Sequence, residues 1–552
     1  MSDDQMDHKS AQFVVRGLIK RFMPNANGNF DLQGPITSED VEALQLLAGV
    51  VATGPIVRVV NGTESTTRKF GEPIIVGSTK PDLASLDARE DADGDVVAVD
   101  FGTAFSKASL WSAKAKTPTP LDLAKQVTEI SGNMLESSVY ITEGVIYFGP
   151  KAEAIFRQED APTRALFDAP KQELSLLGGE TLSQTVGQEL DPTGTMTKRD
   201  LLTLYLAYFS ATISAALEVE GVDRYTTRRF AVPVWKAEKL NTVSRVLKRR
   251  LVDAQIIADT LPFEAWKQGL SVSDAKRLLD ELAGTITDQQ RDDASFISRR
   301  VVEAAAAAAA IGEKLSDRRP VVMVMDVGAG TTDIGLYRFA LPSGNDWKIA
   351  AFDACQGALN LAGRVLDDRL IEFIKARAGI DASSIDGQRV LWALRRDVRR
   401  HKALLFDVGF VDVEELGGQR FDRSEFLASD PVKAFSANLR RQVTSLLNEV
   451  GRSNIEQRDG QFAIVTGGGA NVSIFRDLFN EPFDLADGAL KLEFMDASPE
   501  WLDNYTPDIR GIFPQLAVSI GASSPYLPDE LRPITDASIA PRRVAGVEYR
   551  GS

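Results

Sequence analysis

The stretch that decides the fold is VVMVMDVGAGTTDIGLYRF, residues Val321 to Phe339. Its apolar first part ends at Asp326, and the small residues Gly328, Ala329 and Gly330 follow. Two threonines and a second aspartate come next, before another apolar stretch begins. An apolar run, a glycine-rich segment and a second apolar run predict two buried strands joined by a tight turn.

The same arrangement occurs earlier in the chain, in VVAVDFGTAFSKASLW, residues Val96 to Trp111. Here Asp100 ends the first apolar stretch, and a short turn with Gly102 and Thr103 leads into the second. Two copies of one strand–turn–strand pattern indicate an internal duplication. We therefore expect two related lobes that face each other.

Between and after these two stretches, predicted strands alternate with predicted helices, which is typical of an α/β architecture. Strand patterns occur at 139–149, 228–235 and 462–465, and helical patterns at 201–218, about 236–257 and 301–315. Residues 201–217 carry no charge and reach the short limit for crossing a bilayer. Their Ser and Thr residues and charged flanks favour a buried core helix, so no membrane span is expected.

The chain divides into five segments by composition and pattern. These are a small mixed α/β extension at 1–77, an acidic linker at 78–95, a first lobe at 96–320, a second lobe at 321–528 and a polar tail at 529–552. Within the extension, a helix is predicted from Ser38 to Gly54, with short strands after it.

Composition excludes several classes of function. The net charge of −15 argues against a broad nucleic-acid surface. A single cysteine, Cys355, cannot form an internal disulfide, which fits a reducing, cytoplasmic location. With only two histidines, a zinc or haem site is disfavoured, and any metal is expected to be a hard cation bound through oxygen.

The two glycine-rich turns have the chemistry of a phosphate site. They do not match a dinucleotide-binding loop, because a strand follows the turn where that motif requires a helix, and no lysine of a Walker loop is present. Backbone N–H groups in a tight turn still form an anion nest, to which Thr103, Thr331 and Thr332 add hydroxyl donors. Asp100 and Asp326 would repel a polyphosphate unless Mg²⁺ lies between, so the pair predicts a magnesium site. The alternative is two ordinary hairpin turns.

Seven motifs, taken in order, resemble the actin-like ATPases, and specifically the nucleotide-binding domain of the DnaK-type, seventy-kilodalton heat-shock chaperones. The resemblance covers about Val96 to Leu527. DVGAGTTD is the most specific of the motifs, and the others are DFGTAFS, FAVPVW, VVEAAAAAAA, LAGRVLDDRL, IVTGGGANV and LAVSIGAS. It implies a ribonuclease H-like fold in which two duplicated lobes surround a central nucleotide cleft, with a mobile subdomain at about 364–460.

The resemblance also implies ATP or ADP and Mg²⁺ as ligands and a slow ATP hydrolysis. It implies catalytic roles for Lys171, Glu303, Asp326 and Thr331, with Mg²⁺ held by Asp100 and Asp326. Asp333 matches the second acid of the most specific motif. The implied nucleotide contacts are Asp100, Gly102, Thr103, Ala104, Gly328, Ala329, Gly330, Thr331, Thr332, Lys402, Gly467, Gly468 and Gly469.

The sequence departs from the family in four places. Pro170 precedes the candidate lysine and changes its register, and Arg399 stands where the family has an acidic residue near the adenine. A helical, solvated insertion is expected at about 256–295. No β-rich peptide-binding domain follows the second lobe, while about 95 residues are added at the N-terminus.

We therefore expect a heat-shock-chaperone-like ATPase that switches conformation with its nucleotide and acts on a protein partner. The partner is expected to bind the N-terminal region or the insertion. The alternatives are a filament-forming, actin-like cytoskeletal ATPase and a pseudo-ATPase scaffold that binds nucleotide without turnover. A small-molecule kinase of the sugar-kinase branch would need a catalytic aspartate in the first lobe, and the sequence offers no clear candidate.

Overall fold

The computed structural model describes residues 22–24, 30–32, 80–89, 94–159, 163–175, 181–235, 237–315, 320–340, 348–456, 459–497, 502 and 506–527. The chain forms two compact units, Met1–Phe70 and Gly71–Ser552. In the first unit, the described residues form an antiparallel pair, β1 (Phe22–Pro24) and β2 (Phe30–Leu32). The helix predicted at 38–54, the strands predicted after it and the tail at 529–552 lie outside the described residues.

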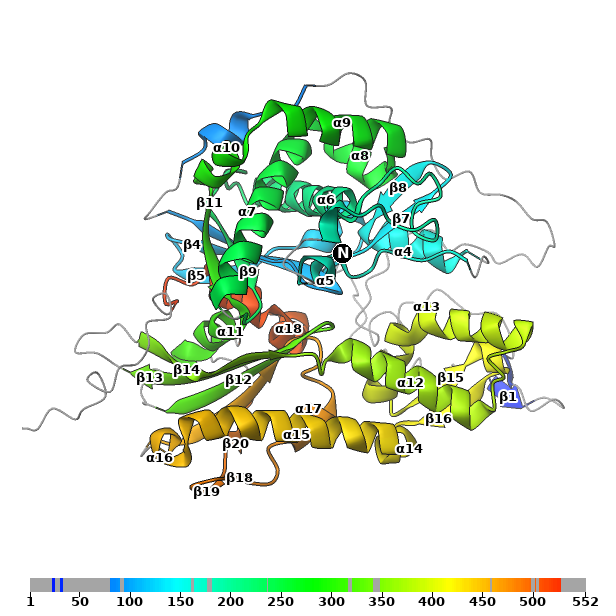
Figure 1. Ribbon diagram of the computed structural model, residues 1–552, viewed down its shortest axis with the longest axis vertical. Coiled ribbons are helices and arrows are strands. Elements are labelled where there is room, and N and C mark those ends of the chain that lie inside the picture. The colour runs from blue at the N-terminus through cyan, green and yellow to red at the C-terminus, as the bar shows by residue number, and fades with distance from the viewer. Residues whose placement is uncertain are drawn as a thin grey trace, which may run out of the picture. The chain divides into compact units, whose positions relative to one another are not determined.

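The second unit is mixed α/β and contains one sheet of six strands and one of five, which share a five-strand path of the same design (Figure 1). The first sheet has the order β11-β9-β3-β4-β5, and the short strand β6 (Leu135–Glu136) also pairs with β4. Its strands are β3 (Val96–Asp100), β4 (Phe105–Ser112), β5 (Thr117–Pro120), β9 (Arg228–Val232) and β11 (Ile297–Val302). β4 and β5 continue from β3 in antiparallel fashion, whereas β9 and β11 add on its other side in parallel.

The second sheet repeats this plan in the order β14-β13-β12-β17-β20. Its strands are β12 (Val321–Val327), β13 (Thr332–Ala340), β14 (Lys348–Leu359), β17 (Gln461–Thr466) and β20 (Glu493–Phe494). Again two strands are antiparallel on one side of the first strand and two are parallel on the other. The short internal repeat in the sequence is thus part of a duplication that includes five strands of each sheet.

Every residue of β3 and β12 is buried. These are the first strands of the two sheets and lie in the middle of them, so both of their faces are covered. A strand covered on both faces needs a continuous apolar run rather than an alternating one. This explains why the two stretches stand out in the sequence.

Helices of the first lobe cover its sheet and form its core. They are α3 (Leu123–Val127), α4 (Gly149–Arg157), α5 (Pro170–Ser175), α6 (Lys198–Val219), α7 (Ala237–Thr260), α8 (Phe263–Gln268), α9 (Val272–Thr285), α10 (Asp288–Asp293) and α11 (Glu303–Ile311). A smaller sheet is built from β7 (Val139–Thr142), β8 (Val145–Phe148) and β10 (Leu270–Ser271).

Helix α6 is the one helix among the described residues that is long and apolar enough to cross a membrane, and 83% of its apolar window is buried inside the lobe. Thr197 caps its N-terminus and Asp200 completes a capping box. The prediction of a buried core helix is confirmed.

The segment expected to be an acidic linker at 78–95 packs on the first lobe where it is described. Ala84–Asp87 form a short 3-10 helix in which Ser85 is fully buried. The backbone N–H of Asp82 donates to Thr260 at 2.9 Å, and Ser295 donates to the carbonyl of Ala88 at 2.9 Å. Leu83 and Leu86, three residues apart, pack against the core of the first lobe, although the segment as a whole is polar and acidic.

The predicted insertion at 256–295 is helical, as expected, but it is not simply solvated. Trp266 of α8 is 2% exposed, and Leu278 and Leu282 of α9 join the core of the first lobe. Charged residues alternate with these apolar ones at helical spacing, so the segment looks polar in the sequence although one face is buried.

The second lobe adds α12 (Gly363–Ala378), α13 (Ile385–Asp407), α14 (Arg423–Ala428), α15 (Asp430–Val450), α16 (Arg452–Ile455), α17 (Ser473–Asp477) and α18 (Pro507–Ser523). It also has two hairpins, β15 (Phe410–Val413) with β16 (Gln419–Asp422), and β18 (Phe483–Leu485) with β19 (Gly488–Leu490). In the segment 364–460, α12, α13 and the β15–β16 hairpin stand beside the sheet, whereas α15 runs along it (Figure 1).

Helices α11 and α18 join the two lobes (Figure 1). A side chain at Gly521 would place its Cβ 1.7 Å from the carbonyl oxygen of Ala306, so the two backbones are in contact. The alanines of α11 are all buried in this contact, which also includes apolar residues of both sheets. The small side chains of the alanine run allow this close approach of the two helices.

Candidate functional site

The turns that end β3 and β12 face each other. In the second turn, Gly328 donates its N–H to the carbonyl of Thr331 at 2.9 Å. A Cβ on Gly330 would lie 2.9 Å from Oγ1 of Thr103, so the two turns are in near contact. In the first turn, a Cβ on Gly102 would lie 1.9 Å from the carbonyl oxygen of Phe105. Glycine is therefore required for the first turn to close, and at Gly330 it allows the two turns to approach closely.

A cavity of about 360 Å³ lies between the lobes at these turns. Fifteen of the sixteen predicted site residues line it. They are Asp100, Gly102, Thr103, Ala104, Lys171, Glu303, Asp326, Gly328, Ala329, Gly330, Thr331, Lys402, Gly467, Gly468 and Gly469. Residues from both lobes, far apart in the sequence, thus meet at one place.

Thr332 is the exception, and its predicted contact with phosphate is not supported. Its side chain is fully buried, and its hydroxyl donates to the carbonyl of Leu361 at 2.7 Å. Thr332 begins β13, where successive side chains point to opposite sides, so Thr331 faces the cavity and Thr332 faces away.

Asp333 lies behind the second turn and holds it in place. One carboxylate oxygen accepts from the hydroxyl of Thr331 at 2.7 Å, and the other accepts from the N–H of Val234 at 2.6 Å. Val234 follows β9 of the first lobe, so Asp333 links the turn of one lobe to the sheet of the other. Burial raises the pKa of this carboxyl.

Lys171 and Glu303 form a buried ion pair at the cavity wall. Pro170, whose presence puts the register of Lys171 in question, is the first residue of α5, a position that suits proline. Glu303 begins α11, directly after β11. The two residues therefore come from separate elements of the first lobe and meet only in the folded chain.

The cavity wall carries more acid than base. Asp100, Asp326 and Glu303 line it, and Asp333 lies just behind. Burial, followed by the charge of Asp100, raises the pKa of Asp326 to about 6. Burial also raises the pKa of Glu303 above its usual range, although the charge of Lys171 opposes this. Such a cluster favours binding of a cation.

A magnesium ion fits the two strand-end aspartates. One oxygen of Asp100 is 3.0 Å from Nζ of Lys107, and one oxygen of Asp326 accepts from Thr466 at 2.9 Å, so each carboxylate keeps a second oxygen. No group of three or more His, Cys, Asp or Glu side chains among the described residues is arranged to hold a metal by itself. This suits Mg²⁺, which keeps several waters and takes one or two carboxylates together with ligand phosphates.

The far end of the cavity is formed by the glycine turn after β17. Gly467 has φ +82°, and its N–H donates to the carbonyl of Pro514 at 2.7 Å. A Cβ on Gly469 would lie 2.2 Å from Cγ1 of Val327, so this glycine packs directly on β12. Gly468 has no atom within 4 Å of its Cβ position and lines the cavity. A flat ligand group can therefore lie against its backbone.

Lys402 and Arg399 of α13 reach the same cavity and are held by acids. Nζ of Lys402 lies 2.7 Å from Asp367 and donates to the carbonyl of Gly363 at 3.0 Å. Arg399 also has a partner, because its guanidinium lies 2.5 Å from the carboxylate of Asp168 in the first lobe.

Several lining residues were not predicted from the sequence. They are Lys107, Asp367, Asp407, Asn471 and Gln515, with apolar residues such as Phe475 beside them. Lys107 could have been predicted from the sequence, because the register of the hairpin places it directly opposite Asp100. Asp367, Asp407 and Gln515 come from helices, where the sequence gives no indication of which face meets the cavity, and Asn471 lies in the turn before α17.

No protein-family model matches this chain. The interpretation of the site therefore depends on its geometry and on the motifs themselves.

Chemically, the cavity combines donors for an extended anion with acids for a metal ion. The turns offer N–H and hydroxyl donors at one end, and the Gly467–Gly469 turn offers a flat surface at the other. Lys171 and Glu303 lie near the turns. This combination suits a ligand with a planar group at one end and phosphates at the other.

Proposed function

We propose that the chain is an actin-like, heat-shock-chaperone-like ATPase that binds Mg-ATP and acts as a nucleotide-driven conformational switch on a protein partner. The observation that carries this proposal is the convergence of two duplicated turns, each next to a strand-end aspartate, on one cavity between two sheets of like topology. A single hairpin turn would have no such counterpart facing it across a cavity.

At the phosphate end, the two turns donate backbone N–H groups to phosphate oxygens, and Thr103 adds its hydroxyl group, whereas the hydroxyl of Thr331 donates to Asp333 and holds the second turn in place. Mg²⁺ held by Asp100 and Asp326 supplies charge neutralisation of the phosphates. Lys171 donates to the terminal phosphate from the opposite wall. Glu303 accepts a hydrogen bond from a water and orients it toward the phosphorus, a task that does not need a strong base.

At the other end, the nucleoside lies on the Gly467–Gly469 turn, with the apolar side chain of Phe475 nearby. Lys402 and Arg399 approach from α13. Both cations are already paired with carboxylates, so their net charge contributes little to ligand binding. They position the ligand mainly by hydrogen bonds and by the shape of the cavity wall.

The switch is supported by contacts that lead from the second turn to the other lobe. The carbonyls of Gly328 and Ala329 accept from the N–H groups of Gly363 and Arg364 at 3.1 and 2.8 Å. Arg364 then donates to Gln172, the neighbour of Lys171, at 2.8 Å. A change in the turn on loss of a phosphate therefore reaches the interface between α12 and the first lobe. The partner would bind the N-terminal region or the helices at 256–295.

Binding is tested by thermal unfolding of the full chain with ATP, ADP or GTP, with and without Mg²⁺. A ligand that binds only the folded state at one hundred times its Kd adds about 2.7 kcal/mol of apparent stability. We expect a shift with ATP or ADP that grows when Mg²⁺ is added. Identical unfolding temperatures under all conditions would remove the basis of the proposal.

Turnover is tested by phosphate release from Mg-ATP by the wild type and by Lys171→Met. Loss of one charge-neutralising donor is expected to lower the rate by about 100-fold. Binding of ATP without any phosphate release would identify a nucleotide-binding scaffold instead, and ATP-dependent pelleting with visible filaments would favour a cytoskeletal role.

A further inference from the structure

A second cavity, of about 470 Å³, lies inside the first lobe and shares no lining residue with the first. It is lined by residues of the N-terminal turn of α6 and of α7, α9 and α10. Two of these helices, α9 and α10, belong to the segment 256–295, which the resemblance to heat-shock chaperones does not cover. The proposed nucleotide function therefore gives this cavity no role.

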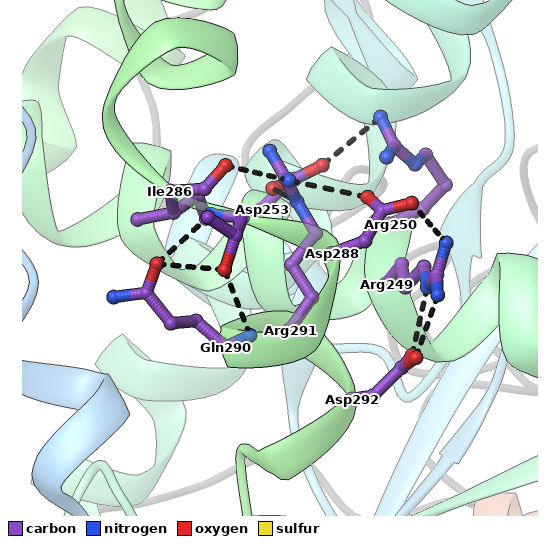
Figure 2. A network of polar contacts seen from close by, with 9 residues as sticks. Arg249, Arg250, Asp253, Ile286, Asp288, Gln290, Arg291 and Asp292 are labelled. Atoms are coloured by element: carbon purple, nitrogen blue, oxygen red, sulfur yellow. Dashed lines mark hydrogen bonds and ion pairs between the residues drawn. The ribbon is translucent and has the colours of Figure 1, made fainter.

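Ion pairs organise one wall of this cavity (Figure 2). Asp253 of α7 bridges two arginines, with Arg291 at 2.6 Å and Arg250 at 2.9 Å. Arg291 also donates to the carbonyl of Ile286 at 2.9 Å. Asp288 joins Arg291 to Arg249, which lies outside the cavity lining. Arg291 thus has three partners among the described residues.

The other aspartates of the lining also have partners. Asp200 accepts from the backbone N–H of Thr197 at 3.0 Å and lies 3.6 Å from Lys276. Asp280 lies 2.6 Å from the same lysine. All four aspartates that line the cavity therefore already accept a hydrogen bond or form an ion pair within the protein.

Donors, in contrast, are left over. Arg199, in the first turn of α6, lines the cavity and has no ion pair within the part of the chain that the structure describes. Arg250 pairs only with Asp253 among the described acids, although a guanidinium has five N–H groups. Burial lowers the pKa of Arg250 and Asp253 only partly offsets this, so a second anion would stabilise the charge. The positive end of the α6 dipole adds to the same field.

We propose that this cavity binds a small molecule that carries a phosphate or carboxylate group, with Arg199 and Arg250 donating to its oxygens. Two guanidinium groups on neighbouring helices suit the planar, two-oxygen recognition of such groups. Lys276 lies close enough to contribute charge, while Arg291 and Asp253 keep Arg250 in position. The site is a second ligand site in the first lobe, independent of the cleft between the lobes.

The test is calorimetric titration of the full chain with inorganic phosphate and, separately, with citrate. Arg199→Ala and Arg250→Met each remove one donor to the ligand and should weaken binding about tenfold or more, which corresponds to one charged hydrogen bond. Arg245→Met is the matched control, because Arg245 belongs to the same helix, α7, is exposed and does not line the cavity. It should change the affinity less than twofold.

Binding of phosphate alone assigns a phosphorylated ligand, and binding of citrate alone assigns a carboxylate. If neither anion binds the wild type, the proposal is wrong. It is equally wrong if an anion binds but Arg199→Ala and Arg250→Met leave its affinity unchanged, because the anion then lies elsewhere, for example in the cleft between the lobes. Arg199 is exposed on α6, so its substitution tests the site even if Arg250→Met does not fold.

Discussion

At the scale of single residues, a substitution at Gly468 should affect ligand binding without affecting folding. An added methyl group there meets no protein atom within 4 Å and would project into the cavity. We expect Gly468→Ala to fold with unchanged helix content and to weaken Mg-ATP binding by about tenfold or more, which equals roughly 1.4 kcal/mol. Circular dichroism and titration with a fluorescent nucleotide measure the two properties.

Gly511→Ala is the control for this substitution, because Gly511 also has open space at its Cβ position but does not line the cavity. It should bind nucleotide as the wild type does. Equal affinities for all three proteins would mean that the ligand does not lie on the Gly467–Gly469 turn.

The raised pKa of Asp326 predicts that the free energy of unfolding depends on pH even without a ligand. Its pKa is raised from 3.8 to about 6 by burial and by the charge of Asp100, with Lys107 opposing and Asp333 adding to the shift. The folded state therefore loses stability as pH rises from about 4 to about 6, because the carboxyl must ionise while buried. Asp326→Asn removes this cost and keeps the acceptor for Thr466. Without metal or nucleotide, it should raise the free energy of unfolding at pH 8 by at most about 3 kcal/mol.

The gain from Asp326→Asn should be smaller at pH 5, where much of the wild-type carboxyl is already protonated. Chemical denaturation at both pH values measures the difference. Glu129→Gln, at an exposed site, is the control and should show no such trend. A variant that is less stable than the wild type at pH 8 would show that the ionised carboxylate is favoured in the folded protein.

At the scale of elements, the contact of α11 with α18 sets how close the two lobes lie. A Cβ at Gly521 would lie 1.7 Å from the Ala306 carbonyl oxygen, and backbone cannot move aside as a side chain can. We expect Gly521→Ala to lower the free energy of unfolding by about 3 kcal/mol, at the upper end for overpacking. Gly511→Ala on the same helix has open space and should be neutral or slightly stabilising. Equal stabilities of the two variants in urea would contradict the close helix approach.

Elements with a local signal could be predicted, and those fixed by distant contacts could not. Elements marked by one apolar stretch and a glycine or polar residue at its end could be found. These are the two strand–turn–strand stretches, the helices at 201–218 and 301–315 and the glycine turn at Gly467. The 3-10 helix at Ala84–Asp87 was missed because it gains stability only by packing on α7. Thr332 was misassigned because the sequence did not show which of two adjacent threonines faces the cavity.

At the scale of the whole molecule, the candidate site depends on contacts between lobes that no local pattern reveals. Asp333 meets Val234 only after both lobes have folded and come together. Lys171 meets Glu303 within the first lobe, but from an element more than 130 residues away in the sequence. The motifs indicated which residues face the cavity, because they recur at the ends of strands. They gave no sign of the carboxylate at Asp168, which lies between Arg399 and Arg364 of the second lobe.

These contacts of Asp168 bridge the two lobes beside the cavity. Its carboxylate lies 2.5 Å from Arg399 and 3.4 Å from Arg364. A second contact between the lobes is aromatic, because Trp392 of α13 packs edge-on against Phe156 of α4. The three charged side chains are 29–38% exposed, so each pair contributes only about 0.2–1 kcal/mol. Asp168→Asn should therefore leave the fold intact but shift the lobes toward an open arrangement.

For a nucleotide enclosed between the lobes, we expect Asp168→Asn to raise the dissociation rate about three- to tenfold, as loss of roughly 0.7–1.4 kcal/mol from the closed state implies. Stopped-flow displacement of a fluorescent ADP measures this rate. The wild-type rate should also rise with salt, because exposed pairs are screened, and the variant should respond less. Asp412→Asn, which breaks a similar exposed pair with Arg420 away from the cavity, is the control. If both variants release ADP at the wild-type rate, the contacts of Asp168 do not limit opening of the lobes.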